Sequence, residues 1–144
     1  MHYIFVYGTL KSNEPNNYRL FDTNNGIAQL HFNSKTRDKW PLIIATNYNI
    51  PFLLNQKGIG EYIDGEIYLV DDQMMSYLDK FEHIPHDYER LQIDVISPDS
   101  NKDLKCWTYL RTKPIVNKLE QNNYLKSYTD SDTYKYIKHD NMPI

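Results

Sequence analysis

The clearest pattern of apolar and polar positions along the chain is strict alternation, which is typical of strands with one buried face. It occurs at 90–96 and again at 104–110, and the polar stretch 97–103 between them predicts a hairpin loop. Shorter apolar runs bounded by Gly, Pro or Asn predict further buried strands. These runs cover residues 3–7, 41–45, 52–54 and 65–70.

One helix is predicted after the last of these short runs. Met74, Leu78 and Phe81 recur at intervals that place them on one helical face. Asp71 or Asp72 precedes them, and Asp is a residue type that caps helix N-termini. The pattern therefore predicts a capped helix whose apolar face packs on the strands.

The remaining segments predict irregular structure. Residues 11–25 are polar and rich in Asn, which favours a loop with one short helical turn. Pro85 is expected to end the helix, and the last third predicts loops and short helices that pack on the sheet. Short strands with one central helix indicate an α+β fold around a curved or closed sheet. Because no linker divides the chain, residues 1–144 are expected to form a single domain.

Composition and charge narrow the classes of function. The 144 residues are 40% hydrophobic and include 13 Tyr, which supplies enough apolar area for one core. The net charge is −3 without a long run of one sign, so neither a nucleic acid nor a membrane is an expected partner. The single Cys106 excludes an internal disulfide and a multi-cysteine zinc site. The first apolar run is too short for a signal peptide, and we expect a cytoplasmic monomer.

The segment Tyr7-Gly8-Thr9-Leu10 is the first candidate site. A strand that ends in Gly lets the backbone turn and present successive amide N–H groups. Such a turn can bind a carboxylate without a charged side chain. A plain strand-to-loop turn is the commoner explanation, and the segment alone leaves both explanations open.

Glu82 is the second candidate. It follows Leu78 and Phe81, the last apolar positions of the predicted helix, and so falls at the rim of the core. A carboxylate in partly dry surroundings has a raised pKa, which suits a general base near neutral pH. Most glutamates at helix ends are solvated, so the position alone does not assign a role.

Three other features have plainer explanations. His83 and His86 have a spacing that could bind a metal on a helix, but Pro85 breaks that geometry, so no metal site is expected. Cys106 falls on the inward face of an alternating strand and is expected to be a packed core thiol. Gly58-Ile59-Gly60 lacks the setting of a dinucleotide loop and predicts a bend.

Several motifs follow one another in an order that is typical of one protein family. They are Tyr3-Ile-Phe-Val-Tyr-Gly-Thr-Leu-Lys11 with Glu14-Pro15-Asn16, Trp40-Pro-Leu-Ile-Ile44, Asn49-Ile50-Pro51-Phe-Leu-Leu54, Gly65-Glu-Ile-Tyr68-Leu-Val-Asp71 and Leu78-Asp79-x-Phe81-Glu82-x-x-Pro85-x-x-Tyr88-x-Arg90. With them the chain resembles the γ-glutamylcyclotransferase-like proteins, and most of all their γ-glutamylamine cyclotransferase branch. Family members often carry Gln where this chain has Glu14 and Trp where it has Phe52, which leaves the fine substrate preference open.

The resemblance implies a fold and a reaction. Proteins of this family fold as a small mixed β-barrel flanked by short helices. They release an amine or amino acid from a γ-glutamyl group by closing that group into 5-oxoproline, and they need no metal and no cofactor. In the branch that this chain resembles, the leaving group is an amine such as the ε-amine of lysine, from the isopeptide left when cross-linked proteins are degraded.

The resemblance also implies roles for the two candidates. The family's carboxylate-binding loop falls on Tyr7, Gly8, Thr9 and Leu10, and its catalytic glutamate falls on Glu82. We expect the loop amides to bind the α-carboxylate and to help orient the γ-carbonyl. We expect Glu82 to take a proton from the α-ammonium group and later to give a proton to the leaving amine.

Ile50, Pro51 and Tyr88 are the other substrate-binding candidates. Ile50 and Pro51 are expected to form part of the pocket wall. Tyr88 and Arg90 either orient Glu82 or stabilise the start of the strand, and the sequence leaves both roles open.

Three functions fit these motifs. The leading one is a γ-glutamylamine cyclotransferase with a small-molecule γ-glutamyl substrate. The second is a cyclotransferase for γ-glutamyl α-amino acids, whose pocket must accept a second α-carboxylate on the leaving group. The third is a non-catalytic member that binds a small ligand, and the carboxylate at position 82 argues against it.

Overall fold

The computed structural model describes residues 1–46, 48–82, 84, 88–100, 102–111 and 124–138. His83, Pro85 and His86 lie outside these residues. The part of Pro85 in ending the helix and the expectation that the two histidines bind no metal therefore stay predictions.

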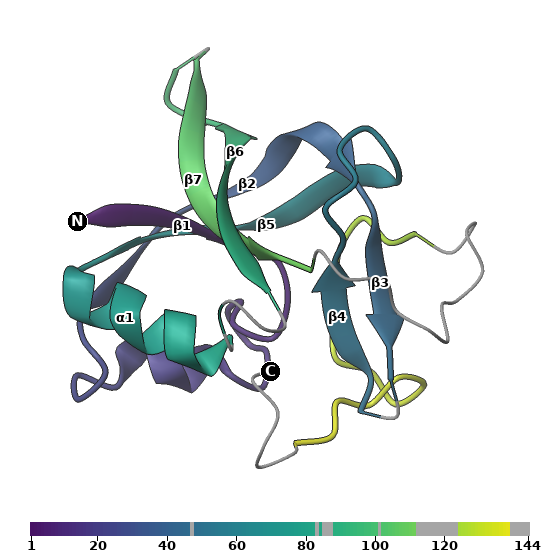
Figure 1. The fold of residues 1–144 in the computed structure, drawn as a ribbon, viewed down its shortest axis with the longest axis horizontal. Helices are drawn as coiled ribbons and strands as arrows, with labels where there is room; N and C mark the ends of the chain where they lie inside the picture. The colour runs from purple at the N-terminus through teal and green to yellow at the C-terminus, as the bar shows by residue number, and fades with distance from the viewer. Residues whose placement is uncertain (47, 83, 85–87, 101, 112–123, 139–144) are drawn as a thin grey trace.

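Five strands form a closed barrel in the order β1-β5-β2-β6-β7 (Figure 1). Neighbouring strands are antiparallel, except that β1 and β7 are parallel where Ile4 pairs with Trp107. The mixed barrel implied by the motifs is therefore confirmed. The strand bounds are β1 His2–Val6, β2 Ala28–Trp40, β5 Glu61–Val70, β6 Glu89–Ile96 and β7 Asp103–Leu110.

A two-stranded antiparallel sheet stands beside the barrel (Figure 1). It consists of β3 (Leu42–Ala45) and β4 (Ile50–Leu53). Nearly all of its residues are buried, which agrees with their continuous apolar sequence. The C-terminal segment runs along this sheet, where Leu125 forms a β-bridge with Leu42.

Helix α1 (Asp72–Phe81) follows β5 and lies against one side of the barrel (Figure 1). The Asp71 side chain accepts a hydrogen bond from the Met74 amide at 2.8 Å, which caps the N-terminus. Met74 and Leu78 are fully buried against the barrel. The predicted helix and its cap are confirmed, and Glu82 is the residue that ends it.

The apolar interior forms two clusters that share strand β1. Successive side chains of a strand point to opposite faces, so Ile4 and Val6 pack in the cluster under α1 whereas Phe5 packs with the other strands of the barrel. Cys106 belongs to the second cluster and is fully buried, which confirms the predicted core thiol. Burial raises the pKa of this thiol to about 12.

Strand β2 is the largest element that the hydrophobic pattern does not predict. Most of its 13 side chains are exposed or half-buried, so it lacks the apolar alternation of the other strands. It pairs with β5 along most of its length, with register shifts after Leu30 and after Lys35. Pairing with β5 and β6, and not an apolar pattern of its own side chains, therefore makes this segment a strand.

The irregular segments agree only in part with the prediction. The short helical turn expected within 11–25 is a 3₁₀ helix, η1 (Asn17–Phe21). The bend at Gly58-Ile59-Gly60 is confirmed, and both glycines have a φ of +96°. Short helices were expected in the last third, but residues 124–138, the part of it after residue 111 that the structure describes, contain none. That segment lies on β3 through Leu125 instead.

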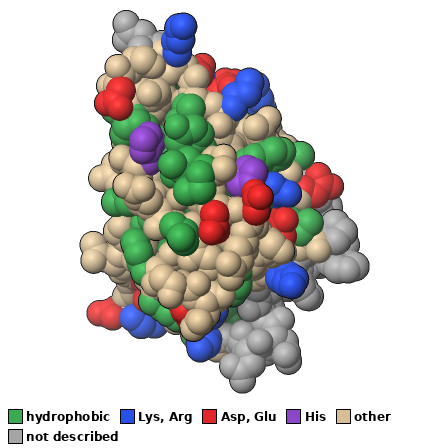
Figure 2. Space-filling model, turned by 90° about the vertical axis from the view of Figure 1, so that its left-hand side faces the viewer, with side chains coloured by type: hydrophobic (Ala, Val, Ile, Leu, Met, Phe, Trp, Pro, Cys, Tyr) green, Lys and Arg blue, Asp and Glu red, His purple; other side chains and the backbone are tan. Residues whose placement is uncertain are grey.

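The surface carries scattered charges of both signs. Figure 2 shows the face on which the N-terminus lies. Apolar, acidic and histidine side chains are mixed on this face, and basic groups lie mostly toward its margins. Within the described ranges, no helix is long and apolar enough to cross a membrane.

Candidate active site

A pocket lies where β1 ends, with an empty volume of about 300 Å³ including its mouth. It brings together the two sites that the sequence singles out, the turn after β1 and the glutamate after α1. The other walls come from β4 and β7. The lining residues are Phe5, Val6, Tyr7, Gly8, Thr9, Leu10, Pro51, Glu82 and Tyr109.

Glu82 is buried at the C-terminal end of α1, with 3% of its surface exposed. Its amide donates to the Leu78 carbonyl at 2.8 Å, which holds it in the last turn. Its Oε2 atom has no hydrogen-bond partner among the described residues. The carboxyl thus faces the pocket with an unused acceptor atom.

The environment of Glu82 disfavours its charged form. Burial raises the pKa of Glu82 well above its usual value, and the negative charge of Asp79 raises it further. The partial negative charge at the C-terminal end of α1 acts in the same direction. A carboxyl with a raised pKa exchanges its proton nearer to neutral pH, as a group that acts first as a base and then as an acid requires.

Three adjacent residues of the turn after β1 line the pocket, and their amides are unpaired among the described residues. Gly8, Thr9 and Leu10 are buried. None of their N–H groups donates a hydrogen bond to another residue within the described ranges. A buried amide without an acceptor is costly. An anion with several oxygen atoms, such as a carboxylate, would satisfy these groups.

Two asparagines hold the other side of this turn. The Asn16 amide donates to the Thr9 carbonyl at 2.8 Å, and Asn16 Nδ2 donates to Thr9 Oγ1 at 3.0 Å. Asn17 Nδ2 donates to the Leu10 carbonyl at 2.9 Å. Because these bonds use two carbonyl groups and the Thr9 hydroxyl, they leave the amides of the turn available to a ligand.

Gly8 is required by close packing and not by a left-handed backbone. A Cβ atom at this position would lie 2.8 Å from Cγ of Pro51. Its φ is outside the positive range, unlike that of Gly58 or Gly60. Gly8 therefore does not free the turn through a special backbone conformation, as the sequence predicted; it lets Pro51 close one wall of the pocket.

The tyrosines of the pocket hydrogen-bond to the protein itself. Tyr7 Oη donates to the Tyr109 carbonyl at 2.6 Å, and Tyr109 Oη donates to Asp79 Oδ1 at 2.8 Å. Burial and then the Glu82 carboxylate raise the pKa of Tyr7, so its phenol stays neutral. Tyr7 therefore supports the site as a rigid wall.

Arg90 reaches Glu82 only through a third residue. Its Nε atom lies 2.9 Å from Asp79 Oδ1, and its guanidinium group stacks 4.7 Å from the centre of the Trp107 ring. Arg90 joins β6 to α1 in this way. It also offsets the charge of Asp79 that acts on Glu82.

Two of the predicted substrate contacts are not among the lining residues. Ile50 is 1% exposed and packs in the cluster under α1. Tyr88 is equally buried and stacks on Phe52, with ring centres 5.9 Å apart. Pro51, predicted together with them, does line the pocket. Direct substrate contact stays a prediction for Ile50 and Tyr88.

The sequence reasoning missed Tyr109 and the clamp made by Asn16. Tyr109 lies on the face of β7 opposite Cys106, and the aromatic pair Trp107 and Tyr109 on that face was the available signal. Asn16 had no signal beyond its place in a motif. Among the described residues, no group of three or more His, Cys, Asp or Glu is placed to hold a metal ion.

Comparisons with known proteins agree with this geometry. A family model described as "Gamma-glutamyl cyclotransferase, AIG2-like" matches residues 4–134. The chain is 44% identical over 134 residues to the Troponin C-akin-1 protein of Drosophila melanogaster, over 93% of this chain and 80% of that protein. It is 41% identical over 115 residues to the gamma-glutamylaminecyclotransferase of Mus musculus, over 76% of this chain and 77% of that protein.

A solved structure supports the same assignment. The crystal structure of an AIG2-like protein from Mus musculus matches with a TM-score of 0.86 and 33% identity, over 98% of each chain. The motifs, the barrel, the family model and these relatives all agree. The chain therefore belongs to the AIG2-like γ-glutamyl cyclotransferase family.

Proposed function

We propose that this protein is a γ-glutamylamine cyclotransferase, which converts a γ-glutamylamine into 5-oxoproline and a free amine. One observation carries the proposal: the buried Glu82 carboxyl shares a pocket with three unused amides, those of Gly8, Thr9 and Leu10. The mouse relative named for this activity supports it.

The turn after β1 binds the glutamyl group. Its amides donate to the α-carboxylate, and the hydrogen bonds from Asn16 and Asn17 keep the turn in place during the reaction. Since the reaction is intramolecular, holding the bent conformer of the substrate is the main task of the pocket. Well-oriented intramolecular reactions reach effective molarities of about 10⁵ M or more.

Glu82 carries the protons between the two nitrogen atoms. It takes one proton from the α-ammonium group, and the freed amine attacks the γ-carbonyl carbon to close the five-membered ring. Glu82 gives that proton to the leaving nitrogen as the carbon–nitrogen bond breaks. The ring nitrogen then loses a second proton, which the departing amine gains, so Glu82 ends as the carboxylate with which it began.

The direct test is turnover of γ-glutamyl-ε-lysine by the purified protein. We expect 5-oxoproline and free lysine in equal amounts, and Glu82→Gln is the matched inactive control. Robust turnover of γ-glutamyl-alanine without turnover of the lysine compound would instead assign the activity on γ-glutamyl α-amino acids. Absence of 5-oxoproline from both compounds would refute the proposal.

We further propose that the enzyme acts as a cytoplasmic monomer on this small substrate. The pocket supports the monomeric state, because the turn, the glutamate and the walls come from one chain. Sedimentation at the enzyme concentration of the assay tests it. Activity confined to a dimer would contradict it, and fractionation of cells would test the location.

A further inference from the structure

The two reactive parts of the pocket come from elements that are far apart in the chain. The amides belong to the turn after β1, whereas the carboxyl belongs to Glu82, directly after α1. Ring closure needs both parts in register, since a misplacement of about 1 Å can cost roughly 10²-fold in rate. A side chain that contacts both parts would therefore affect the rate.

Arg19 lies on the short helix η1 and reaches the turn through Asn16. Its Nε atom donates to Asn16 Oδ1 at 3.0 Å. Asn16 is buried, and its Nδ2 atom donates to Thr9 Oγ1 at 3.0 Å. Because the amide oxygen only accepts and the amide nitrogen only donates, the bond from Arg19 fixes the way in which the Asn16 side chain faces. Arg19 thereby orients the group that holds Thr9.

The same guanidinium group reaches the last two turns of α1 directly. Its Nη1 atom donates to Tyr77 Oη at 2.9 Å, and its Cζ atom lies 4.6 Å from the centre of the Phe81 ring. These two rings stack on each other, with their centres 6.2 Å apart. Phe81 is the last residue of the helix, and Glu82 follows it. Arg19 therefore packs on the residue next to the proposed catalytic carboxyl.

Directed hydrogen bonds and stacking, and not an ion pair, hold the Arg19 guanidinium group. No acidic side chain within the described ranges pairs with it. A planar guanidinium group presents its donors in fixed directions and stacks on aromatic rings, whereas a lysine ammonium is a point charge on a flexible stem. The contacts of Arg19 therefore depend on the shape of its side chain and not only on its charge.

We propose that Arg19 is a positioning residue, which holds the turn after β1 and Glu82 at the spacing that ring closure requires. This role rests on the function proposed above. A second link between the two parts runs through Tyr109, whose carbonyl accepts from Tyr7 Oη and whose hydroxyl donates to Asp79 of α1. Loss of Arg19 therefore loosens the site without separating its two parts.

The test measures kcat and KM for γ-glutamyl-ε-lysine. Arg19→Gln removes the planar fork and the charge, and Arg19→Lys keeps the charge alone. Both variants should lower kcat about tenfold, because the link through Tyr109 remains. KM should stay within about twofold, since the turn keeps its amides. Arg37→Gln is the matched control, because Arg37 contacts Asp103 outside the pocket, and it should keep the wild-type kcat.

A double-mutant cycle separates positioning from a general loss of stability. Tyr77→Phe keeps the ring that stacks on Phe81 and removes only the hydroxyl that Arg19 contacts. It should lower kcat less than Arg19→Gln does. In the double variant it should add nothing to the effect of Arg19→Gln, because the two residues act through one contact.

Three results would overturn the role of Arg19 and leave the proposed function intact. They are a wild-type kcat in Arg19→Gln, full rescue by Arg19→Lys, and additive losses in the double variant. If Arg19→Gln does not fold, Tyr77→Phe alone decides, and an unchanged kcat in that variant would overturn the role. No turnover by the wild type would refute the proposed function itself.

Discussion

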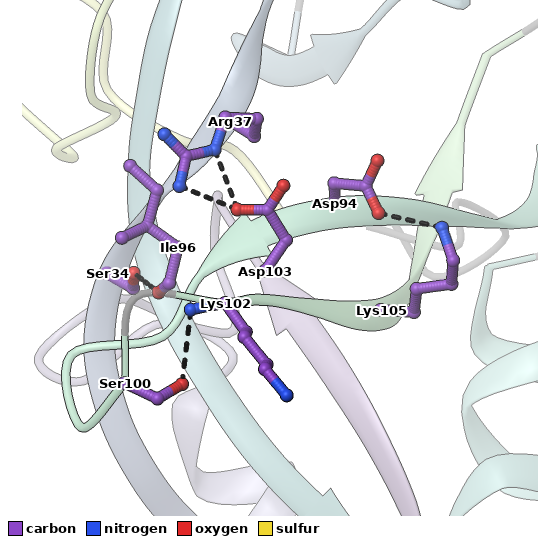
Figure 3. A network of polar contacts seen from close by, with 8 residues as sticks. All are labelled: Ser34, Arg37, Asp94, Ile96, Ser100, Lys102, Asp103 and Lys105. Atoms are coloured by element: carbon purple, nitrogen blue, oxygen red, sulfur yellow. Dashed lines mark hydrogen bonds and ion pairs between the residues drawn. The ribbon is translucent and has the colours of Figure 1, made fainter.

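The catalytic pocket and the hairpin of β6 and β7 differ in whether their polar groups have partners within the protein. On the hairpin, charged groups pair with each other in water (Figure 3). Arg37 on β2 contacts Asp103 through Nε at 2.7 Å and Nη2 at 2.6 Å. Lys105 contacts Asp94 at 2.8 Å. All four side chains are 30% exposed or more.

The pocket shows the reverse arrangement. Its carboxyl and its three adjacent amides are buried, and the carboxyl atom Oε2 and the three amides have no partner among the described residues. A buried polar group without a partner costs about 1–3 kcal/mol, whereas an exposed ion pair contributes little. The pocket therefore contains unpaired polar groups that destabilise the fold and that a bound substrate would satisfy. The exposed ion pairs contribute little to stability and need no ligand.

The largest expected effect is on catalysis, from Glu82→Gln. The amide keeps the shape of the side chain but cannot carry protons, so kcat/KM for γ-glutamyl-ε-lysine should fall by about 10²–10⁴-fold. Formation of 5-oxoproline measures it. Retention of the wild-type rate would show that another group carries the protons.

The same substitution should not destabilise the fold. The pKa of Glu82 is raised in the folded state, so above its unfolded value of about 4.3 the folded protein holds a proton that the unfolded chain has lost. The contribution of this group to stability therefore falls as pH rises from the unfolded pKa to the folded pKa. Denaturant unfolding between pH 5 and 8 should show Glu82→Gln becoming more stable relative to the wild type as pH increases. A variant that becomes less stable relative to the wild type as pH rises would contradict the assigned burial.

Gly8→Ala should have the next largest effect. The new methyl group would press on Pro51 and move the turn, which should lower kcat/KM by about 10²-fold and stability by about 1–3 kcal/mol. Gly58→Ala is the matched control, because its Cβ meets no atom within 4 Å although its φ of +96° is strained. It should lower stability and leave kcat/KM unchanged. Equal losses of activity in both variants would show that general destabilisation is the cause.

Asp79→Asn should change the pH dependence more than the maximal rate. The Asn side chain still offers an oxygen to Tyr109 Oη, but it removes the charge that raises the pKa of Glu82. The acid limb of the kcat/KM profile should therefore move to lower pH. A profile that stays in place would show that Asp79 does not act on the catalytic carboxyl.

The smallest effect is expected from Arg37→Gln, which removes the ion pair between β2 and the hairpin. The ion pair with Asp103 is exposed, so kcat/KM should not change and the midpoint of thermal unfolding should fall by no more than a few degrees. The difference should vanish at high salt, because salt screens exposed charges. A large loss of activity would mean that the two regions are coupled.

The same contrast explains what could be predicted from the sequence. The turn after β1 and Glu82 could be found because motifs mark them, and helix α1 could be found because its apolar face must pack on the barrel. Strand β2 could not, because its mostly exposed side chains carry no apolar pattern. The clamp by Asn16 holds Thr9, a near neighbour in the chain, through polar contacts that no apolar pattern marks. The wall by Tyr109 depends on its contact with Tyr7, which lies far away in the chain. Such contacts exist only once the barrel has closed.

The central claim is that the pocket keeps its amides free for the carboxylate of the substrate. A titration with 5-oxoproline, followed by the ¹⁵N–¹H NMR signals of the backbone, tests it most directly. The amide signals of Gly8, Thr9 and Leu10 should shift together as the product binds, while those of β6 and β7 around Asp94 and Lys105 should stay in place. Saturable binding of 5-oxoproline that leaves the signals of Gly8, Thr9 and Leu10 unchanged would contradict it.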